Sequence, residues 1–147
     1  MSNNRLNRFL EAQQNTYSNA LAEIKQGRKS GHWMWFIFPQ LKGLGFSTTS
    51  EFYGIDGRDE ALEFLENPVL GARLKEISGA LLQLKTNDAM EVMGSPDHMK
   101  LRSSMTLFSL LPGSDPVFEQ VLEKYFTAER DKKTLEILAG MRVNDGR

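Results

Sequence analysis

The sequence predicts a mainly α-helical protein, a single compact domain of about six helices around an aromatic-rich, partly irregular central segment. Leu, which favours helices, occurs 19 times, whereas the β-branched residues Val and Ile occur five times each. Apolar residues recur at helical spacing between clear start and stop signals. A length of 147 residues fits one domain, expected to span residues 1–147 with a frayed tail from about residue 141.

The first half of the chain contains two helical patterns. Over residues 4–25, apolar side chains recur every three or four positions, and Gly27 follows as a stop signal. A second, short helix is predicted over Asp59–Glu66. It must end near Asn67, because Pro68 disfavours helical geometry in the residue before it.

Three of the four remaining helices are predicted to start at a capping residue followed by proline, at Asn67-Pro68, Ser95-Pro96 and Asp115-Pro116. The helix after Pro68 has the clearest amphipathic pattern, and its apolar face is expected in the core: Leu70, Leu74, Ile77, Leu81 and Leu84. The helix after Pro96 is expected to close at Pro112-Gly113, and a last short helix begins at Asp131.

The segment Gly31–Gln40 is too aromatic for an exposed loop, since it holds both tryptophans and two of the nine phenylalanines. It is either a buried strand or a buried central helix, and its rings can also wall a pocket for a base, a sugar or an apolar ligand. At least one of Trp33 and Trp35 is therefore expected to line a pocket. His32, at the start of the run, is either a structural hydrogen-bonding residue or a catalyst.

The loop Lys42–Ser50 contains two glycines but gives only a weak phosphate-binding signal, because no third glycine opens a long helix. Ser50 is expected to cap a short helix that contains Glu51 and Tyr53 and ends at Gly54.

A second unusual segment, Gly94–Thr106, is polar, and the free amides at the start of its helix can receive an anion. Helical spacing places Asp97, Lys100 and Ser104 on one face, with Arg102 on another. We expect this helix to bring Asp97 and Arg102 within reach of His32. The alternative is that these side chains form an ordinary solvated first turn.

Composition excludes several classes of function. The chain has 18 basic and 19 acidic residues, so there is no strong nucleic-acid signal. It has no cysteine and two histidines, which argues against disulfides, a thiol nucleophile and a metal centre. No apolar run approaches the roughly 20 residues of a membrane span, and the N-terminus has no apolar signal segment, so a cytoplasmic location is expected.

Four strings closely resemble an uncharacterised bacterial family known as domain of unknown function 1810: His32–Gln40, Tyr53–Ile55, Pro68–Leu74 and Lys100–Phe108. The resemblance runs from about Leu6 to Leu138 and implies a single-domain, mainly α-helical protein of unknown function. Some members of this family carry the name calpastatin. That name does not suit the chain, because calpain inhibitors of that kind are long and disordered whereas this composition is globular.

A weaker resemblance concerns the string Thr49–Tyr53, which is similar to a T-S-E-H-Y string of the NADAR family, whose members act on ADP-ribose-linked or N-glycosidic substrates. The resemblance implies that Glu51 is the matching carboxylate and that Asp97 is a second polar anchor. The tryptophan-glycine motif that follows the acidic residue in that family is replaced here by Lys100–Ser104.

Two functions from different classes are compatible with the sequence. The first is binding or hydrolysis of a nucleotide-like or ADP-ribose-like ligand by an N-glycosidase, without a cofactor or metal. Its candidate catalytic residues are Glu51, Asp97 and His32. Its candidate ligand-binding residues are Trp33, Trp35, Gln40, Tyr53, Lys100, Arg102 and Ser103. The second is a non-catalytic protein-interaction or stress-associated helical domain, in which the aromatic run is only core.

Overall fold

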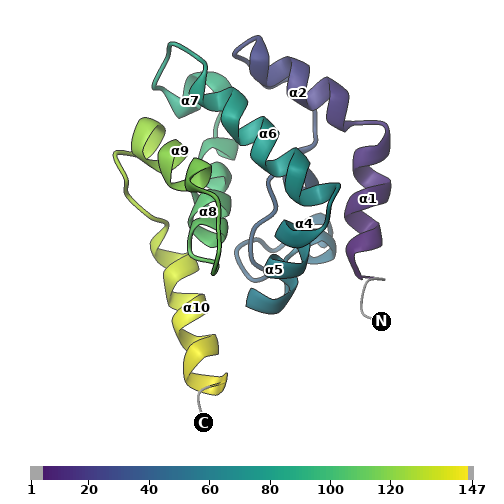
Figure 1. Ribbon diagram of the computed structural model, residues 1–147, viewed down its shortest axis with the longest axis vertical. Coiled ribbons are helices and arrows are strands. Elements are labelled where there is room, and N and C mark those ends of the chain that lie inside the picture. Colours follow the sequence, from purple (N-terminus) through teal and green to yellow (C-terminus); the bar gives the residue numbers. More distant parts are fainter. Residues whose placement is uncertain (1–4, 146–147) are drawn as a thin grey trace.

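The computed structural model describes residues 5–145, which form ten helices and no strand (Figure 1). The helices are α1 (Asn7–Gln14), α2 (Tyr17–Lys25), α3 (Met34–Ile37), α4 (Thr48–Tyr53), α5 (Arg58–Glu66), α6 (Leu70–Leu82), α7 (Ala89–Met93), α8 (Asp97–Ser109), α9 (Pro116–Phe126) and α10 (Lys132–Asp145). None of these helices is long and apolar enough to cross a membrane.

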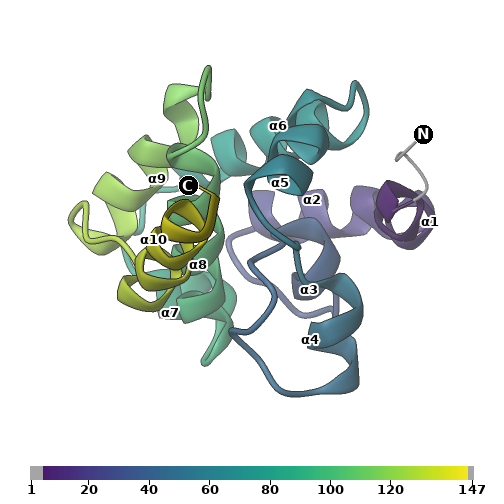
Figure 2. The same ribbon diagram turned by 90° about the horizontal axis from the view of Figure 1, so that it is seen from below.

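Two helices, α6 and α8, organise the packing. Helix α6 packs against α2, α5 and α9, whereas α8 packs against α5, α7, α9 and α10. Figure 2 shows α7–α10 on one side of the molecule and α1–α5 on the other. The chain thus has two halves, which are joined where α6 packs against α9 and where α5 packs against α8.

The predicted amphipathic helix after Pro68 is confirmed, and its apolar stripe is core. Leu70, Leu74, Ile77 and Leu81 are at most 1% exposed. Leu84 lies just past the end of α6 and is partly buried against the same core. The period of the apolar residues alone therefore identified the buried face.

The mainly helical class is confirmed, but the number of helices differs from the predicted six. One reason is that the pattern over residues 4–25 divides at Asn15 and Thr16, two residues that are weak helix formers. The break lets Phe9 and Gln13 face α3, while Tyr17 and the rest of α2 face α6. The other additions are the short helices α3 and α7, whereas the short helix expected at Glu51 and Tyr53 is present as α4 and ends before Gly54, as predicted.

The cap signal was right at Asp115, and at Asn67 the side chain bonds as predicted although α6 itself begins later, at Leu70. Asn67 Oδ1 accepts from the amides of Val69 and Leu70, and Asp115 Oδ1 accepts from Val117. Ser95 does not cap α8, whose N-cap residue is Pro96 with no side-chain bond. The cap of α4 is likewise Ser47, not Ser50, which donates its amide to Ser47 Oγ.

The central segment is neither a strand nor a long helix. After α3, a single parallel bridge pairs Leu41 with Ile55, and the amide of Ile55 donates to the carbonyl of Gln40 at 2.9 Å. The last helix, α10, is longer than predicted: the expected tail is helical as far as Asp145, and residues 146–147 lie outside the described part of the chain.

Burial of α6 predicts the cost of truncating its apolar side chains. Leu74→Ala and Leu81→Ala are each expected to lower the free energy of unfolding by roughly 2–5 kcal/mol, because a cavity remains in the core. Leu135→Ala, at a position 38% exposed, is the control and should cost much less. Urea denaturation measures all three, and losses below about 0.5 kcal/mol at both core positions would contradict the assigned core.

Candidate functional site

A groove of about 330 Å³ lies where the two halves of the molecule meet. Its walls come from α3, the following loop, the first turns of α8 and the start of α10. The lining residues are Trp35, Gln40, Leu44, Gly45, Pro96, Met99, Lys100, Ser103, Asp131 and Lys133. Four of the predicted ligand-binding residues therefore meet here: Trp35, Gln40, Lys100 and Ser103.

Trp35 forms a half-buried wall of this groove, as expected for one of the two tryptophans. The ammonium of Lys100 lies 4.6 Å from the centroid of its ring. Gly45 packs against the same ring: a Cβ at this position would lie 3.2 Å from Cη2 of Trp35 and 2.8 Å from Cβ of Ser50. Glycine is needed here because the loop and the indole approach so closely.

Gln40 lies at the inner end of the groove and is only 6% exposed. Its backbone carbonyl is used in the bond to Ile55, which fixes the main chain. Within residues 5–145, no donor or acceptor forms a hydrogen bond with its side-chain amide. The nitrogen and oxygen of this amide stay open to the groove, so Gln40 offers two donors and an acceptor to water or to a molecule bound there.

Next to the groove, two lysines share the carboxylate of Asp97. Lys29 Nζ lies 2.8 Å from Oδ2, and Lys100 Nζ lies 2.9 Å from Oδ1. Lys29 is nearly buried and also stacks on the ring of Trp33, 4.9 Å from its centroid. Burial would raise the pKa of Asp97, but the hydrogen bonds from the two lysines hold it below its usual value.

The start of α10 adds two charged residues that the sequence analysis did not select. Asp131 Oδ2 caps α10 by accepting from the amide and hydroxyl of Thr134, at 2.9 and 2.7 Å. Lys133 is exposed at the edge of the groove. The sequence could identify Asp131 as a helix cap. It could not show that Asp131 lines the groove with Lys100, because this placement depends on the packing of α10 against α8.

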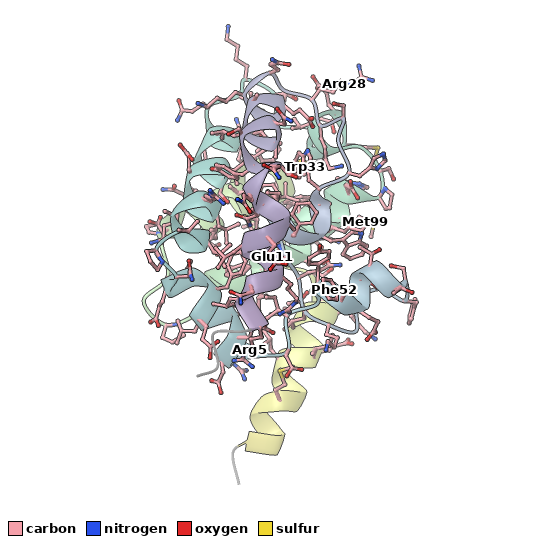
Figure 3. The ribbon with its side chains drawn as sticks, turned by 90° about the vertical axis from the view of Figure 1, so that its right-hand side faces the viewer. Arg5, Glu11, Arg28, Trp33, Phe52 and Met99 are labelled. Atoms are coloured by element: carbon pink, nitrogen blue, oxygen red, sulfur yellow. The ribbon has the colours of Figure 1, made fainter. Side chains whose placement is uncertain are left out.

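Trp33 and His32 do not line the groove. Trp33 is 2% exposed and donates from Nε1 to Glu23 at 2.9 Å, so it is a core residue (Figure 3). The same carboxylate accepts from the amides of Ser30 and Gly31; burial would raise the pKa of Glu23, but these bonds hold it below its usual value. His32 is exposed, and within the described chain no hydrogen bond or ion pair joins it to Asp97 or Arg102.

Glu51 and Tyr53 belong to another part of the surface. Glu51 is exposed on α4 and contributes to a separate depression of about 370 Å³, lined by Arg5, Arg8, Lys42, Phe52, Asp56 and Glu60. Tyr53 is half-buried, with its ring 5.9 Å from that of Phe9 and 5.3 Å from that of Phe36. Neither residue reaches the groove at Trp35.

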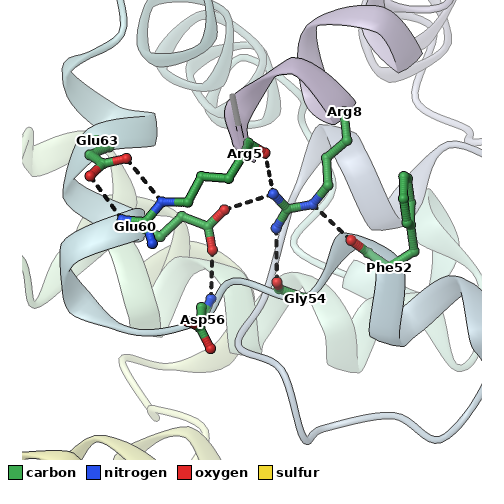
Figure 4. Close-up of polar contacts among 7 residues, drawn as sticks. All are labelled: Arg5, Arg8, Phe52, Gly54, Asp56, Glu60 and Glu63. Atoms are coloured by element: carbon green, nitrogen blue, oxygen red, sulfur yellow. Dashed lines mark hydrogen bonds and ion pairs between the residues drawn. The ribbon is translucent and has the colours of Figure 1, made fainter. Parts of the chain in front are cut away.

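Arg8 holds this second region together (Figure 4). Its guanidinium donates to the carbonyls of Phe52 and Gly54, at 2.7 and 3.0 Å, and to that of Arg5. Nη1 also lies 2.8 Å from the buried Oε2 of Glu60, close enough for an ion pair although not aligned as a hydrogen bond. With its donors used in this way, Arg8 is a structural residue that ties α1 to α4 and α5.

Arg102 points away from the groove, toward the end of α9. Nη1 lies 3.3 Å from Glu129, and the guanidinium is 5.9 Å from the centroid of Phe126. Helical spacing did predict that Arg102 and Lys100 lie on different faces of α8. The spacing could not show that α9 covers one of these faces while the groove opens over the other. No group of His, Cys, Asp or Glu in the described chain could hold a metal ion.

The structure is thus a small helical domain with a groove of mixed polar and apolar lining at Trp35. The sequence model of the family described as "Protein of unknown function (DUF1810)" matches residues 3–138, so the chain belongs to the DUF1810 family. A crystal structure of the conserved hypothetical protein Rv1873 from Mycobacterium tuberculosis is similar to it, with a TM-score of 0.89 and 42% identity. The match covers 91% of this chain and 96% of that one. No curated protein matches the chain.

The Asp97 ion pairs predict a pH-dependent contribution to stability. Asp97→Asn should lower the free energy of unfolding at pH 7, because the two partly buried ammonium groups lose their shared carboxylate. The pKa of Asp97 is lower in the folded chain than its ordinary value of 3.8, so this stabilisation is present above that pH and is lost as the pH falls through the folded pKa.

Urea midpoints of the parent and of Asp97→Asn, measured between pH 7 and pH 2.5, should therefore converge in acid. Asp59→Asn, at an exposed position in the first turn of α5, is the control. A difference in midpoint that stays constant down to the lowest pH would show that the stabilisation does not come from the ionised carboxylate of Asp97.

Proposed function

We propose that the groove at Trp35 binds a small nucleotide-like ligand. The observation that carries this proposal is the side-chain amide of Gln40, which opens into the groove and has no hydrogen-bond partner in the described chain. A bound molecule with donors and acceptors along one edge can replace the water at this amide and pair with both of its polar atoms. The edge of a nucleobase has this character.

The other walls suit the remaining parts of such a ligand. The face of Trp35 supports stacking of a planar ring, while Ser103 contributes a hydroxyl. Lys100 uses one of its three donors on Asp97 and has two left, and Lys133 is free to approach an anion from the rim. The three lysines around the groove outnumber the two nearby carboxylates, which favours a negatively charged group such as phosphate.

The groove volume indicates the size of this ligand. About 330 Å³ is at the lower end of the range of about 300–1,000 Å³ for small-molecule sites. A mononucleotide suits this volume better than a dinucleotide. An ADP-ribose-like molecule would place one half in the groove and extend the other half over the rim.

Hydrolysis of an N-glycosidic bond at this groove would depend on Asp131. It is the carboxylate among the lining residues, whereas Glu51 lies in the other depression and Asp97 is held by two lysines. A carboxylate there can orient water toward the sugar carbon and stabilise positive charge on the ring. The catalytic step is tested by release of free base from a bound nucleoside derivative.

Ligand binding is tested with variants of Trp35, Lys133 and Gln40 and with one control. Trp35→Leu should weaken binding of AMP, GMP, CMP, UMP or ADP-ribose by about 1–3 kcal/mol, because stacking is lost. Lys133→Ala should weaken binding by about 1 kcal/mol, as expected for an exposed charge. Lys132→Ala, one residue before it and outside the lining set, should leave binding unchanged. Thermal shift identifies the ligand, and calorimetry gives Kd.

Gln40→Leu separates a binding role from a structural one. Since the amide has no protein partner, its replacement by an apolar group of similar size should leave the melting temperature equal or higher while binding weakens. A large loss of stability would instead show that the amide supports the fold. A parent protein that binds none of these nucleotides would overturn the proposed function.

A further inference from the structure

The loop Gly43–Phe46 carries a feature that the groove alone does not explain. Phe46 is 98% exposed, more than any other large apolar side chain in the described chain. It directly follows Gly45, which lines the groove and packs against Trp35, so the two Cα atoms are about 3.8 Å apart. An exposed phenylalanine ring is apolar surface that gains free energy when it is buried. Here it lies beside a groove that has one aromatic wall.

The segment that carries Phe46 is anchored at both ends and unbonded in between. Before it, the amide of Lys42 donates to the carbonyl of Ile55 at 2.8 Å. After it, Ser47 caps α4 through two bonds with Ser50, of 3.0 and 2.8 Å. Within the described chain, residues 43–46 form no backbone hydrogen bond with any partner.

The backbone just before Phe46 is held in place, because Leu44 packs against the core and Gly45 packs against Trp35. Gly43 has a φ of +101°, in a region that side chains other than glycine rarely adopt. Rotation of the Phe46 side chain costs no hydrogen bond and leaves Gly45 against Trp35, and it can bury the ring.

We propose that Phe46 is the second aromatic wall of the groove and closes over a planar base stacked on Trp35, which makes the site specific for the base of a nucleotide. The proposal rests on the proposed function and adds the element that selects the ligand. Trp35 is fixed by its packing against Gly45 and Lys100, whereas Phe46 is free to move. The base would then be held between one rigid and one mobile ring.

Rings stacked face to face at van der Waals distance on both sides of a base contribute independently of the phosphate. Loss of Phe46 should therefore affect only ligands that contain a base. Lys133, in contrast, acts on the phosphate, so its loss should affect all phosphorylated ligands. Comparing AMP with ribose 5-phosphate distinguishes these two effects, because the second molecule lacks the base.

The experiment measures Kd by calorimetry for AMP and ribose 5-phosphate with the parent chain and three variants. Phe46→Ala should raise the Kd of AMP about 5- to 100-fold and leave that of ribose 5-phosphate within twofold of the parent. Phe46→Tyr should restore binding of AMP, since the ring is kept. Phe52→Ala is the matched control: Phe52 is 57% exposed but lines the other depression, so both values should stay unchanged.

Melting temperatures should be equal for the parent and Phe46→Ala, because an exposed side chain contributes little to folding. Equal Kd values of AMP for Phe46→Ala and the parent would overturn this inference and leave the proposed function standing. No binding of AMP or any other nucleotide by the parent would overturn both. Self-association of the parent that Phe46→Ala abolishes, with nucleotide binding unaffected, would assign the ring to a contact between copies of the chain.

Discussion

The burial of α8 is the constraint on which the rest of the structure depends. From Leu101 to Phe108 all of its residues are buried except the half-buried Arg102, so four other helices must pack around it. Three of the buried residues are Ser103, Ser104 and Thr106, whose small size lets these neighbours approach closely. Two of their hydroxyls donate to carbonyls one turn earlier, at 3.2 and 2.8 Å, so most of this polarity is satisfied inside the helix.

Apart from Arg102, a helix that is covered in this way is accessible at its ends, and this determines where a site can form. The first turn of α8 emerges between the loop after α3 and the start of α10, and this is where the groove lies. Asp97, at the first position, holds Lys29 and Lys100, and each lysine stacks on one tryptophan of the aromatic segment. The same contacts therefore attach the two halves of the molecule and direct Lys100 to the groove.

Sequence patterns predicted what depends on local chemistry and missed what depends on packing. The stripe of α6 and the caps at Asn67 and Asp115 follow from periodicity and from the side-chain oxygens, so they were predictable. The break at Asn15 and the helix α7 also have local causes, weak helix formers in the first case and the Asp88 cap in the second, but neither signal is strong enough by itself to set the boundary of a helix. The same distinction applies to the residues of the groove. Trp35 and Lys100 lie in unusual segments of the sequence and were predicted, whereas Lys133 lines the groove only because α10 packs against α8.

The two tryptophans show why aromatic character alone does not identify a binding residue. They are two positions apart in one short segment, yet Trp33 has its indole nitrogen bonded to Glu23 and is enclosed, whereas Trp35 faces a glycine. A side chain at position 45 would fill the space against this ring and push the loop away. The absence of a side chain at Gly45 thus lets the loop approach Trp35 and places Phe46 next to the groove, where its ring is left in solvent. Local sequence supplies the rings, but the close approach at Gly45 decides which of them can meet a ligand.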